Sequence, residues 1–223
     1  MERSVQQDQL FSELAVVGKA FGSAKRLVLV ELLAQGERTV EALAAAAGMG
    51  LSTASAHLQV LKLANVVQTR REGTRIHYRL AGDDVAALYD AMRTVARTRS
   101  ADVGRALDAY LNVPDADEVA LVSRDELTRL LETGRVDVID VRPREEFVAG
   151  HIPGARSLPF EQLTAAAESL RTEAPVVAYC RGAYCVLAHD AVRLLGGEGI
   201  AARRLEDGML EWRTHGHPVE VGA

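Results

Sequence analysis

Apolar side chains recur at helical spacing through the first part of the chain. One face of an expected helix is formed by Leu10, Phe11, Leu14 and Val17. Residues 24–33 are so rich in leucine and valine that they predict a second, largely buried helix, and Gly36 is placed to end it. The chain therefore begins with a helical region.

Two more helices are expected on either side of a glycine turn. Thr39 has the side chain of an N-cap and opens a short helix through Ala47. Residues 48–50 (GMG) make a turn, and the next helix covers about residues 51–64. Two helices joined by a short turn are typical of a helix-turn-helix, whose second helix enters the major groove of DNA.

An alternation with period two follows these helices. Residues 66–71 and 74–80 predict two strands joined around Gly73. This hairpin is basic, since it carries Arg70, Arg71, Arg75 and Arg79. Such a hairpin is typical of a wing that contacts DNA phosphates or the minor groove, although a solubilising surface is the simpler alternative.

The second half of the chain alternates between strand and helix patterns. Residues 123–126 (SRDE) form a capping-box signature that opens a helix, which Gly134 ends before a strand over residues 136–141. The alternation continues to the C-terminus and predicts a parallel sheet covered by helices. Between the halves we expect a helical extension from Ser100 and a polar linker at residues 114–118.

The clearest chemical signal is a cysteine at the end of a buried strand. Residues 176–179 form a short apolar run, and a helical pattern begins near Val186. Cys180 in the loop between them is expected among backbone N–H groups at a helix N-terminus, where the dipole favours anions. The adjacent Arg181 adds positive charge, so we expect a lowered pKa for the Cys180 thiol and a nucleophilic thiolate.

The same loop contains the second cysteine of the chain, Cys185. Its side chain either packs as a small apolar group or acts as a resolving partner for Cys180. The backbone of the intervening residues is expected to surround a bound anion or substrate, at Gly182, Ala183 and Tyr184. In the same half of the chain, three histidines are expected at the surface: His189, His215 and His217.

Length and composition allow one or two globular domains, with 223 residues of which 48% are hydrophobic. No apolar run has membrane-spanning length and no signal-peptide pattern is present, so we expect a cytoplasmic protein without a membrane partner. Residues 1–100 hold 13 Lys+Arg and 10 Asp+Glu (+3), whereas residues 101–223 hold 13 and 21 (−8). The positive balance of the first part is compatible with nucleic acid but too small to argue for it alone.

Three segments of the first part resemble the ArsR-type winged-helix repressors: RLVLVELL (26–33), STASAHLQVL (52–61) and REGTRIHY (71–78). The resemblance implies a homodimer closed by the first and last helices of the domain, and it implies binding to double-stranded operator DNA. The last helix carries a matching apolar stripe of Val85, Leu88, Met92 and Val95. The DNA contacts implied for the second helix of the motif come from Ser52, Thr53, Ser55 and His57. Those implied for the wing come from Arg70, Arg71 and Arg75.

The chain departs from the metal-sensing members of that family. Residues 43–46 (LAAA) stand where those members have cysteines, and no cluster of histidines and carboxylates replaces them in residues 85–97. Thiolate metal sites need closely spaced soft ligands. We therefore expect no metal and no other cofactor.

Two motifs that flank the cysteine loop resemble those of the rhodanese (sulfurtransferase) family: VIDVRPREEFVAGHIPGA (138–155) and LEDGMLEW (205–212). Within them, Asp140 and Arg142 are expected to form a structural ion pair, and His151 to fix a turn. The expected organisation is a mainly α winged helix-turn-helix domain over residues 1–99 and an extension and linker over 100–119. An α/β rhodanese-like domain with a parallel sheet follows over 120–223.

Two functions remain open. The first is a transcription regulator whose rhodanese-like domain senses reactive sulfur, with Cys180 taking a sulfane sulfur from thiosulfate, polysulfide or a persulfide carrier. Cys185 would then attack the Cys180 persulfide, and Arg181 would stabilise the anion. The second is a thiosulfate or persulfide sulfurtransferase with an accessory DNA-binding domain. An arsenate-reductase-like activity is less favoured, because the loop ends at Cys185 without a closing arginine.

Overall fold

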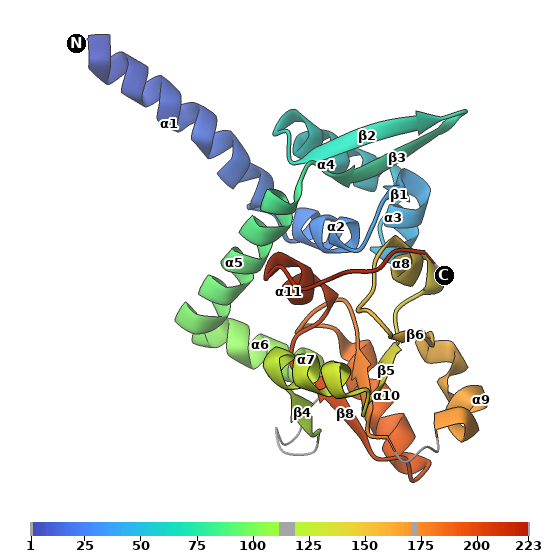
Figure 1. Ribbon diagram of the computed structural model, residues 1–223. Coiled ribbons are helices and arrows are strands. Elements are labelled where there is room, and N and C mark those ends of the chain that lie inside the picture. Colours follow the sequence, from blue (N-terminus) through green and yellow to red (C-terminus); the bar gives the residue numbers. More distant parts are fainter. Residues whose placement is uncertain (1, 112–118, 171–173, 223) are drawn as a thin grey trace. The chain divides into compact units, whose positions relative to one another are not determined.

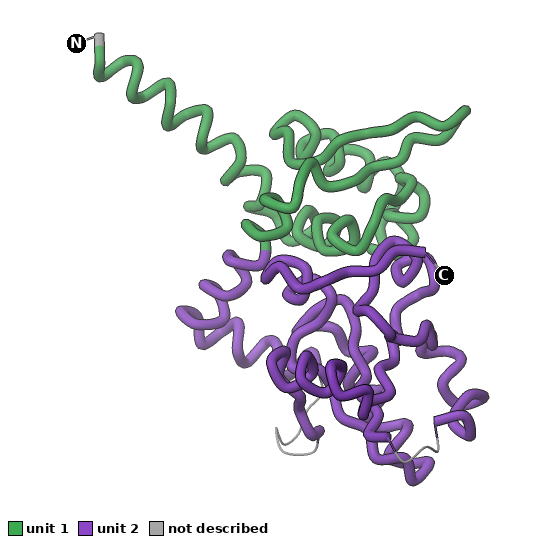
Figure 2. Tube along the Cα trace, in the orientation of Figure 1, with its two compact units in different colours: residues 1–89 green, residues 90–223 purple. Residues whose placement is uncertain are grey.

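The computed structural model describes residues 2–111, 119–170 and 174–222, and the chain divides into two compact units, residues 1–89 and 90–223 (Figure 2). The boundary falls inside helix α5 (Asp83–Arg99), so residues 90–99 of this helix are grouped with the second unit. The linker expected at residues 114–118 lies outside the described residues. No helix within the described ranges has the length and apolar character needed to cross a bilayer.

The first unit contains the predicted helices and hairpin (Figure 1). Its helices before α5 are α1 (Glu2–Phe21), α2 (Ala24–Ala34), α3 (Val40–Ala46) and α4 (Leu51–Leu63). Its strands are β1 (Arg38–Thr39), β2 (Val67–Glu72) and β3 (Arg75–Leu80). The two-residue strand β1 was not predicted, and it pairs with β3 to give an antiparallel sheet of order β1-β3-β2.

Local signals explain where these elements begin and end. The side chain of Thr39 accepts a hydrogen bond from the backbone N–H of Ala42 and caps α3 as predicted. Gly73 has a φ of 59° in the hairpin turn, a conformation that glycine adopts without steric cost. The helices α2, α3 and α4 pack on one another, and each contributes an almost fully buried leucine: Leu33, Leu43 and Leu58.

The second unit is an α/β fold around a parallel sheet, as predicted. Its strands are β4 (Leu121–Val122), β5 (Asp137–Asp140), β6 (Arg156–Ser157), β7 (Val176–Tyr179) and β8 (Ala202–Leu205). Its helices after α5 are α6 (Ala101–Leu111), α7 (Arg124–Thr133), α8 (Arg144–Ala149), α9 (Leu163–Ala166), α10 (Val186–Gly197) and α11 (Met209–Thr214). Short 3₁₀ segments cover η1 (Phe160–Gln162) and η2 (Ala167–Leu170). The strand order is β4-β8-β7-β5-β6, and each neighbouring pair is parallel.

Both faces of this sheet are buried against helices. Ile139 and Ala178 belong to a core cluster with residues of α9 and α10. Val138 and Val177, the neighbours of these residues on the same strands, belong to a second cluster with residues of α7 and α11. The alternation places β7 between two helical layers, which is why its four residues are all apolar or aromatic and all buried.

Candidate functional site

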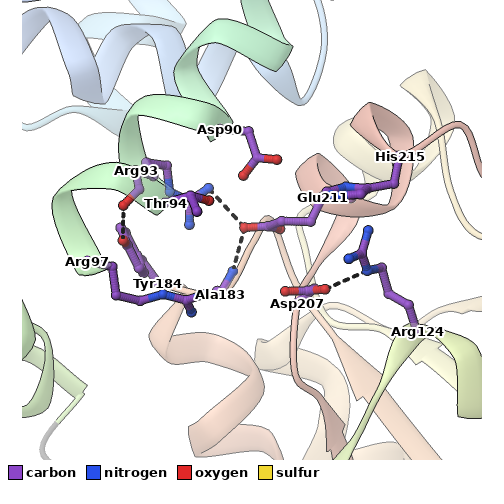
Figure 3. A pocket seen from close by; sticks show the side chains of 10 residues that line it. All are labelled: Asp90, Arg93, Thr94, Arg97, Arg124, Ala183, Tyr184, Asp207, Glu211 and His215. Atoms are coloured by element: carbon purple, nitrogen blue, oxygen red, sulfur yellow. Dashed lines mark hydrogen bonds and ion pairs between the residues drawn. The ribbon is translucent and has the colours of Figure 1, made fainter. Parts of the chain in front are cut away.

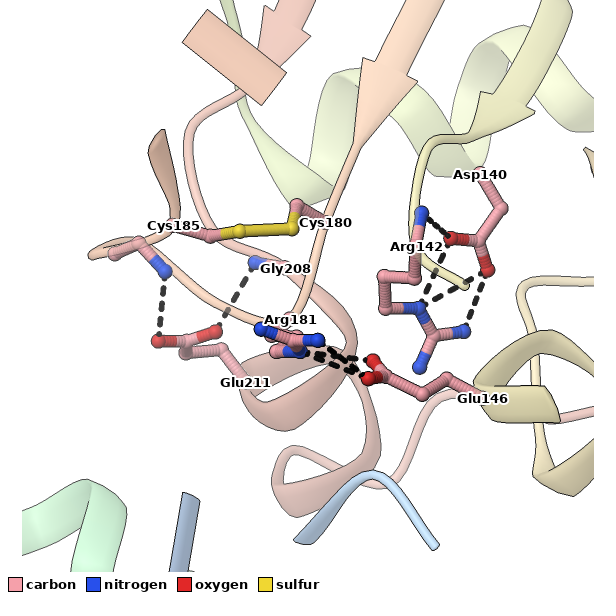
Figure 4. The surroundings of a disulfide bond; sticks show 9 residues. Asp140, Arg142, Glu146, Cys180, Arg181, Cys185, Gly208 and Glu211 are labelled. Carbon is pink, nitrogen blue, oxygen red and sulfur yellow. Dashed lines mark hydrogen bonds and ion pairs between the residues drawn. A yellow bond between two sulfur atoms is a disulfide. The ribbon is translucent and has the colours of Figure 1, made fainter. Parts of the chain in front are cut away.

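The loop after β7 holds both cysteines of the chain. Cys180 directly follows the strand and is 1% exposed, and Cys185 is the N-cap residue of α10. The structure joins their sulfur atoms in a disulfide bond (Figure 4). The predicted strand–loop–helix arrangement is therefore present, and Cys185 occupies the N-cap position of α10, where its side chain forms no capping hydrogen bond.

Neighbouring backbone closely confines the cysteine loop. The N–H of Cys185 donates to the carbonyl of Gly182, which closes a turn between the two cysteines. The N–H groups of Met209 and Leu210, at the start of α11, donate to the carbonyls of Cys180 and Arg181. Gly208 is required at this contact, because a Cβ there would collide with the backbone of Gly182 and the carbonyl of Cys180.

Arg181 is directed toward a carboxylate of α8 (Figure 4). Its Nε and Nη2 atoms donate to the carboxylate of Glu146 at 2.6–3.0 Å, and Glu146 is 1% exposed. Sequence reasoning did not identify Glu146 as this partner. The role predicted for Arg181 as an anion stabiliser stays a prediction, since its guanidinium is shared with a buried carboxylate.

Asp140 and Arg142 form the ion pair that was predicted between β5 and the following loop. The Nε atom of Arg142 donates to Asp140 at 2.9 Å, its Nη2 atom donates to the carbonyl of Gly150, and both side chains are fully buried. Nδ1 of His151 lies 2.9 Å from the carbonyl oxygen of Phe147, which ties the turn after α8 to that helix. These residues shape the loops beside the cysteines.

Glu211 of α11 contacts the loop from the other side, and sequence reasoning missed it. Its carboxylate accepts hydrogen bonds from the N–H groups of Ala183 and Gly208 at 3.2 and 3.0 Å. Arg93 of α5 forms an ion pair with it at 3.1 Å. Burial raises the pKa of the Glu211 carboxyl, and Arg93 and the amide donors oppose that shift.

A cavity of about 220 Å³ adjoins this part of the loop (Figure 3). Its lining consists of Asp90, Arg93, Thr94, Arg97, Arg124, Ala183, Tyr184, Asp207, Glu211 and His215. Arg124 and Asp207 of the lining pair at 2.7 Å, and the lining contains three arginines and three carboxylates. The lining is polar and not biased toward anions.

The prediction that His189 lies at the surface is wrong. His189 is on α10 and only 5% exposed, because this face of the helix packs into the interior of the unit. Burial, together with the nearby charges of Arg204 and Arg193, lowers the pKa of His189 to about 4. His215 is exposed and His217 is half-buried, stacked on Trp212 with 4.3 Å between ring centroids.

The predicted DNA-contacting residues lie in two elements of the first unit. Ser52 and Thr53 are exposed on the first turn of α4, and Ser55 and His57 on the next turn are half-buried. In the hairpin, Arg70 is held by the carboxylates of Glu37 and Glu72 at 2.6 and 2.8 Å. Arg71 and Arg75 are exposed, and within the described residues neither forms an ion pair.

Among the described residues, no group of three or more histidine, cysteine, aspartate or glutamate side chains is arranged to hold a metal ion. Residues 43–46, the segment without cysteines noted in the sequence, lie in α3. Leu43 and Ala44 are buried in the helical core of the first unit.

Comparison with known families gives two matches. Residues 23–69 match the model described as "Bacterial regulatory protein, arsR family". Residues 123–215 match the model of the rhodanese-like domain. The first range covers α2–α4 and the start of the hairpin, and the second covers strands β5–β8 of the parallel sheet with both cysteines.

Individual relatives extend these matches. The chain is 50% identical to the HTH-type transcriptional regulator Rv0324 of Mycobacterium tuberculosis over 214 residues, which covers 96% of this chain and 93% of the relative. It is 40% identical to the biofilm growth-associated repressor of Agrobacterium fabrum over 84 residues, or 38% of this chain and 72% of the relative. A solved winged helix-turn-helix domain from Mycobacterium bovis, described as homodimeric, is 51% identical, with a TM-score of 0.41, and covers 42% of this chain and 87% of that domain.

Proposed function

The chain belongs to the ArsR family of bacterial regulatory proteins and carries a rhodanese-like domain, and from this we propose that it is a DNA-binding regulator that senses reactive sulfur at Cys180. The observation that carries the proposal is the pair of cysteines at the carboxyl end of a central parallel strand. In open α/β sheets, ligands bind at this edge. A thiol pair close enough for a disulfide gives the site two distinct chemical states.

The first step of the proposed chemistry forms a persulfide. The thiolate of Cys180 attacks the outer sulfur of thiosulfate, the S–S bond of thiosulfate breaks, and its electron pair leaves with sulfite. With an inorganic polysulfide or a persulfide carrier, the shortened polysulfide or the carrier thiolate leaves instead. Cys180 then carries the sulfane sulfur.

The second step forms the disulfide. The thiolate of Cys185 attacks the Sγ atom of the Cys180 persulfide, and the outer sulfur leaves as hydrogen sulfide with the electron pair. Two thiols are oxidised and one sulfane sulfur is reduced, so the donor itself is the oxidant. The support for this step is the disulfide between Cys180 and Cys185.

The regulatory output is proposed to come from the first unit acting as a homodimer on double-stranded operator DNA. Helix α4 supplies base contacts from Ser52, Thr53, Ser55 and His57, and the wing supplies phosphate contacts from its arginines. A change at Cys180 alters DNA affinity only if it favours one of two protein states that bind DNA differently. The coupling free energy between two such sites is typically about 1–3 kcal/mol.

Binding to a DNA duplex selected from a random library tests the proposal. Selection is made separately with the reduced protein and with protein treated with sodium tetrasulfide, and affinities are measured by fluorescence anisotropy. We expect the treatment to change the affinity of the wild-type protein by about 5- to 150-fold. The Cys180→Ser variant should not respond, and in Cys185→Ser the Cys180 persulfide should accumulate without a disulfide.

Two results would contradict the regulator. The first is an unchanged DNA affinity although mass spectrometry shows Cys180 to be modified. The second is rapid, multiple-turnover transfer of sulfur from thiosulfate to cyanide with no sequence-specific DNA binding, which favours the sulfurtransferase enzyme instead.

A further inference from the structure

A buried ion pair beside the cysteine loop has no part in the proposed sulfur chemistry. Arg93 and Glu211 lie 3.1 Å apart, and their side chains are 6% and 7% exposed. The Glu211 carboxylate also accepts the N–H of Ala183, which lies in the loop between the two cysteines. The two buried charges thus pair with each other, and the Glu211 carboxylate is bound in addition by the loop backbone.

Arg93 contacts the residues on both sides of Ala183 as well. Its Nη1 atom would lie 3.1 Å from a Cβ built on Gly182, so the guanidinium packs directly on that glycine. The hydroxyl of Tyr184 donates to the backbone carbonyl of Arg93 at 3.2 Å. The guanidinium also lies over the Tyr184 ring, 4.1 Å from its centroid. One arginine therefore contacts the loop on both sides of Ala183, and Figure 3 shows it beside Tyr184.

Arg93 belongs to α5, a continuous helix that begins in the first unit and ends in the second. One turn earlier on the same helix, Asp90 accepts a hydrogen bond from the hydroxyl of Thr214 in α11 at 3.0 Å. The C-terminal part of α5 is thus attached both to the cysteine loop and to the helix that carries Glu211. Its N-terminal part holds Val85 and Leu88 of the apolar stripe expected at the dimer contact.

A change in the loop therefore affects α5. If Ala183 and Tyr184 move, the Glu211 carboxylate loses the N–H donor of Ala183. The backbone carbonyl of Arg93 loses the Tyr184 hydroxyl, and the Arg93 guanidinium loses the Tyr184 ring. A buried charge that loses its partners is strongly unfavourable, so the pair must rearrange together with the loop. Because α5 is one hydrogen-bonded helix, that rearrangement changes the position or order of its last two turns.

We propose that Arg93 is the positioning residue that links the state of the Cys180–Cys185 loop to helix α5. The closed disulfide holds Gly182, Ala183 and Tyr184 against Arg93 and Glu211. Opening of the disulfide, or a persulfide on Cys180, releases this contact and frees α5. The consequence for DNA affinity rests on the proposed function, whereas the link between loop and helix is a property of the second unit alone.

Hydrogen exchange measures the link directly in the full-length protein. Amide exchange over residues 90–99 is compared between the disulfide form and the form reduced with dithiothreitol. In the wild-type protein we expect exchange in this segment to be slower in the disulfide form, by at least about threefold. In Arg93→Gln the two forms should exchange at equal rates.

Arg97→Gln is the matched control, because it removes the same charge one turn later on α5 from an exposed side chain. This variant should keep the wild-type difference. Tyr184→Phe removes only one hydroxyl and should reduce the difference, which keeps the test decisive if Arg93→Gln does not fold. The proposal is overturned if Arg93→Gln or Tyr184→Phe retains the full wild-type difference, or if the wild-type protein shows none.

DNA binding separates this proposal from the proposed function. Where tetrasulfide changes the DNA affinity of the wild-type protein, the ratio of affinities should approach one in Arg93→Gln while Cys180 is modified to the same extent. If the wild-type affinity does not change but the exchange over residues 90–99 does, the sensing function fails and the link between Arg93 and the loop stands.

Discussion

Individual side chains in the second unit are placed by charge pairing that the local sequence does not reveal. Arg181 follows Cys180 in the chain, yet its guanidinium pairs with Glu146, thirty-five residues earlier. The loop amide of Ala183 is bound by Glu211, twenty-eight residues later. The Arg181 guanidinium and the Ala183 N–H were both expected to face an anionic substrate. In the structure each binds a carboxylate of the protein instead. A buried charge needs such a partner, because the interior solvates it poorly.

His189 provides a test at the residue scale. Its pKa of about 4 in the folded protein lies below the ordinary histidine value of about 6.5, because burial and two nearby arginines disfavour the charged ring. As the pH falls, His189 is therefore protonated in the unfolded chain before it is protonated in the folded protein. The free energy of unfolding decreases for this reason between about pH 6.5 and pH 4.

We expect the His189→Gln variant to lose less unfolding free energy than the wild-type protein between about pH 7 and pH 5. Denaturant titrations at several pH values measure this difference, and the imidazole resonance of His189 gives its pKa directly by NMR. An NMR titration midpoint at the ordinary histidine value, or identical pH profiles for the two proteins, would contradict the burial argument.

At the scale of elements, the hairpin β2–β3 is the clearest case in which pattern and structure agree. The alternation predicted two strands, the turn falls at Gly73, and the arginines lie on the hairpin. The structure adds that these arginines differ. All three of Arg70, Arg71 and Arg75 are exposed, but Arg70 is held by Glu37 and Glu72, whereas Arg71 and Arg75 belong to no ion pair in the described part of the chain.

The wing should therefore contact DNA phosphates mainly through Arg71 and Arg75. Replacement of either by glutamine should weaken binding to all duplexes alike and lower the slope of log K against log salt by about one. The measurement is a salt titration of DNA affinity. Arg156→Gln removes an equal charge from β6 in the second unit and should leave the slope unchanged. A wild-type slope in both wing variants would exclude a phosphate contact by this hairpin.

At the scale of the whole molecule, the first helix has apolar side chains that the described part of the chain leaves exposed. Leu10, Phe11 and Leu14 of α1 are each 58% exposed. Leu88 and Val95 of α5, from the stripe expected at the dimer contact, are 46% and 61% exposed. Exposed apolar patches of this kind mark interaction surfaces, and a second copy of the chain is the partner that the proposed function requires.

Replacement of Leu14 by glutamate should weaken that homodimer about tenfold or more, because each dimer buries the residue twice and a buried leucine contributes about 1.5–3 kcal/mol. Sedimentation velocity over a concentration series measures the dissociation constant. Val221→Glu is the control, since Val221 is also an exposed apolar residue but lies at the other end of the chain. A Leu14→Glu protein that dimerises as tightly as the wild-type protein would remove α1 from the interface.

The sequence alone determined the local elements and their order. Thr39 and Ser123 cap helices through their own side chains, Gly73 and Gly134 adopt positive φ values at turns, and the apolar run before Cys180 is a strand. These outcomes depend on interactions within a few residues. Tertiary structure decided which distant groups meet: β1 with β3, Arg181 with Glu146, and Arg93 with the cysteine loop. Such pairs are selected by burial and by the requirement that every buried charge has a partner, and neither is fixed until the whole chain has folded.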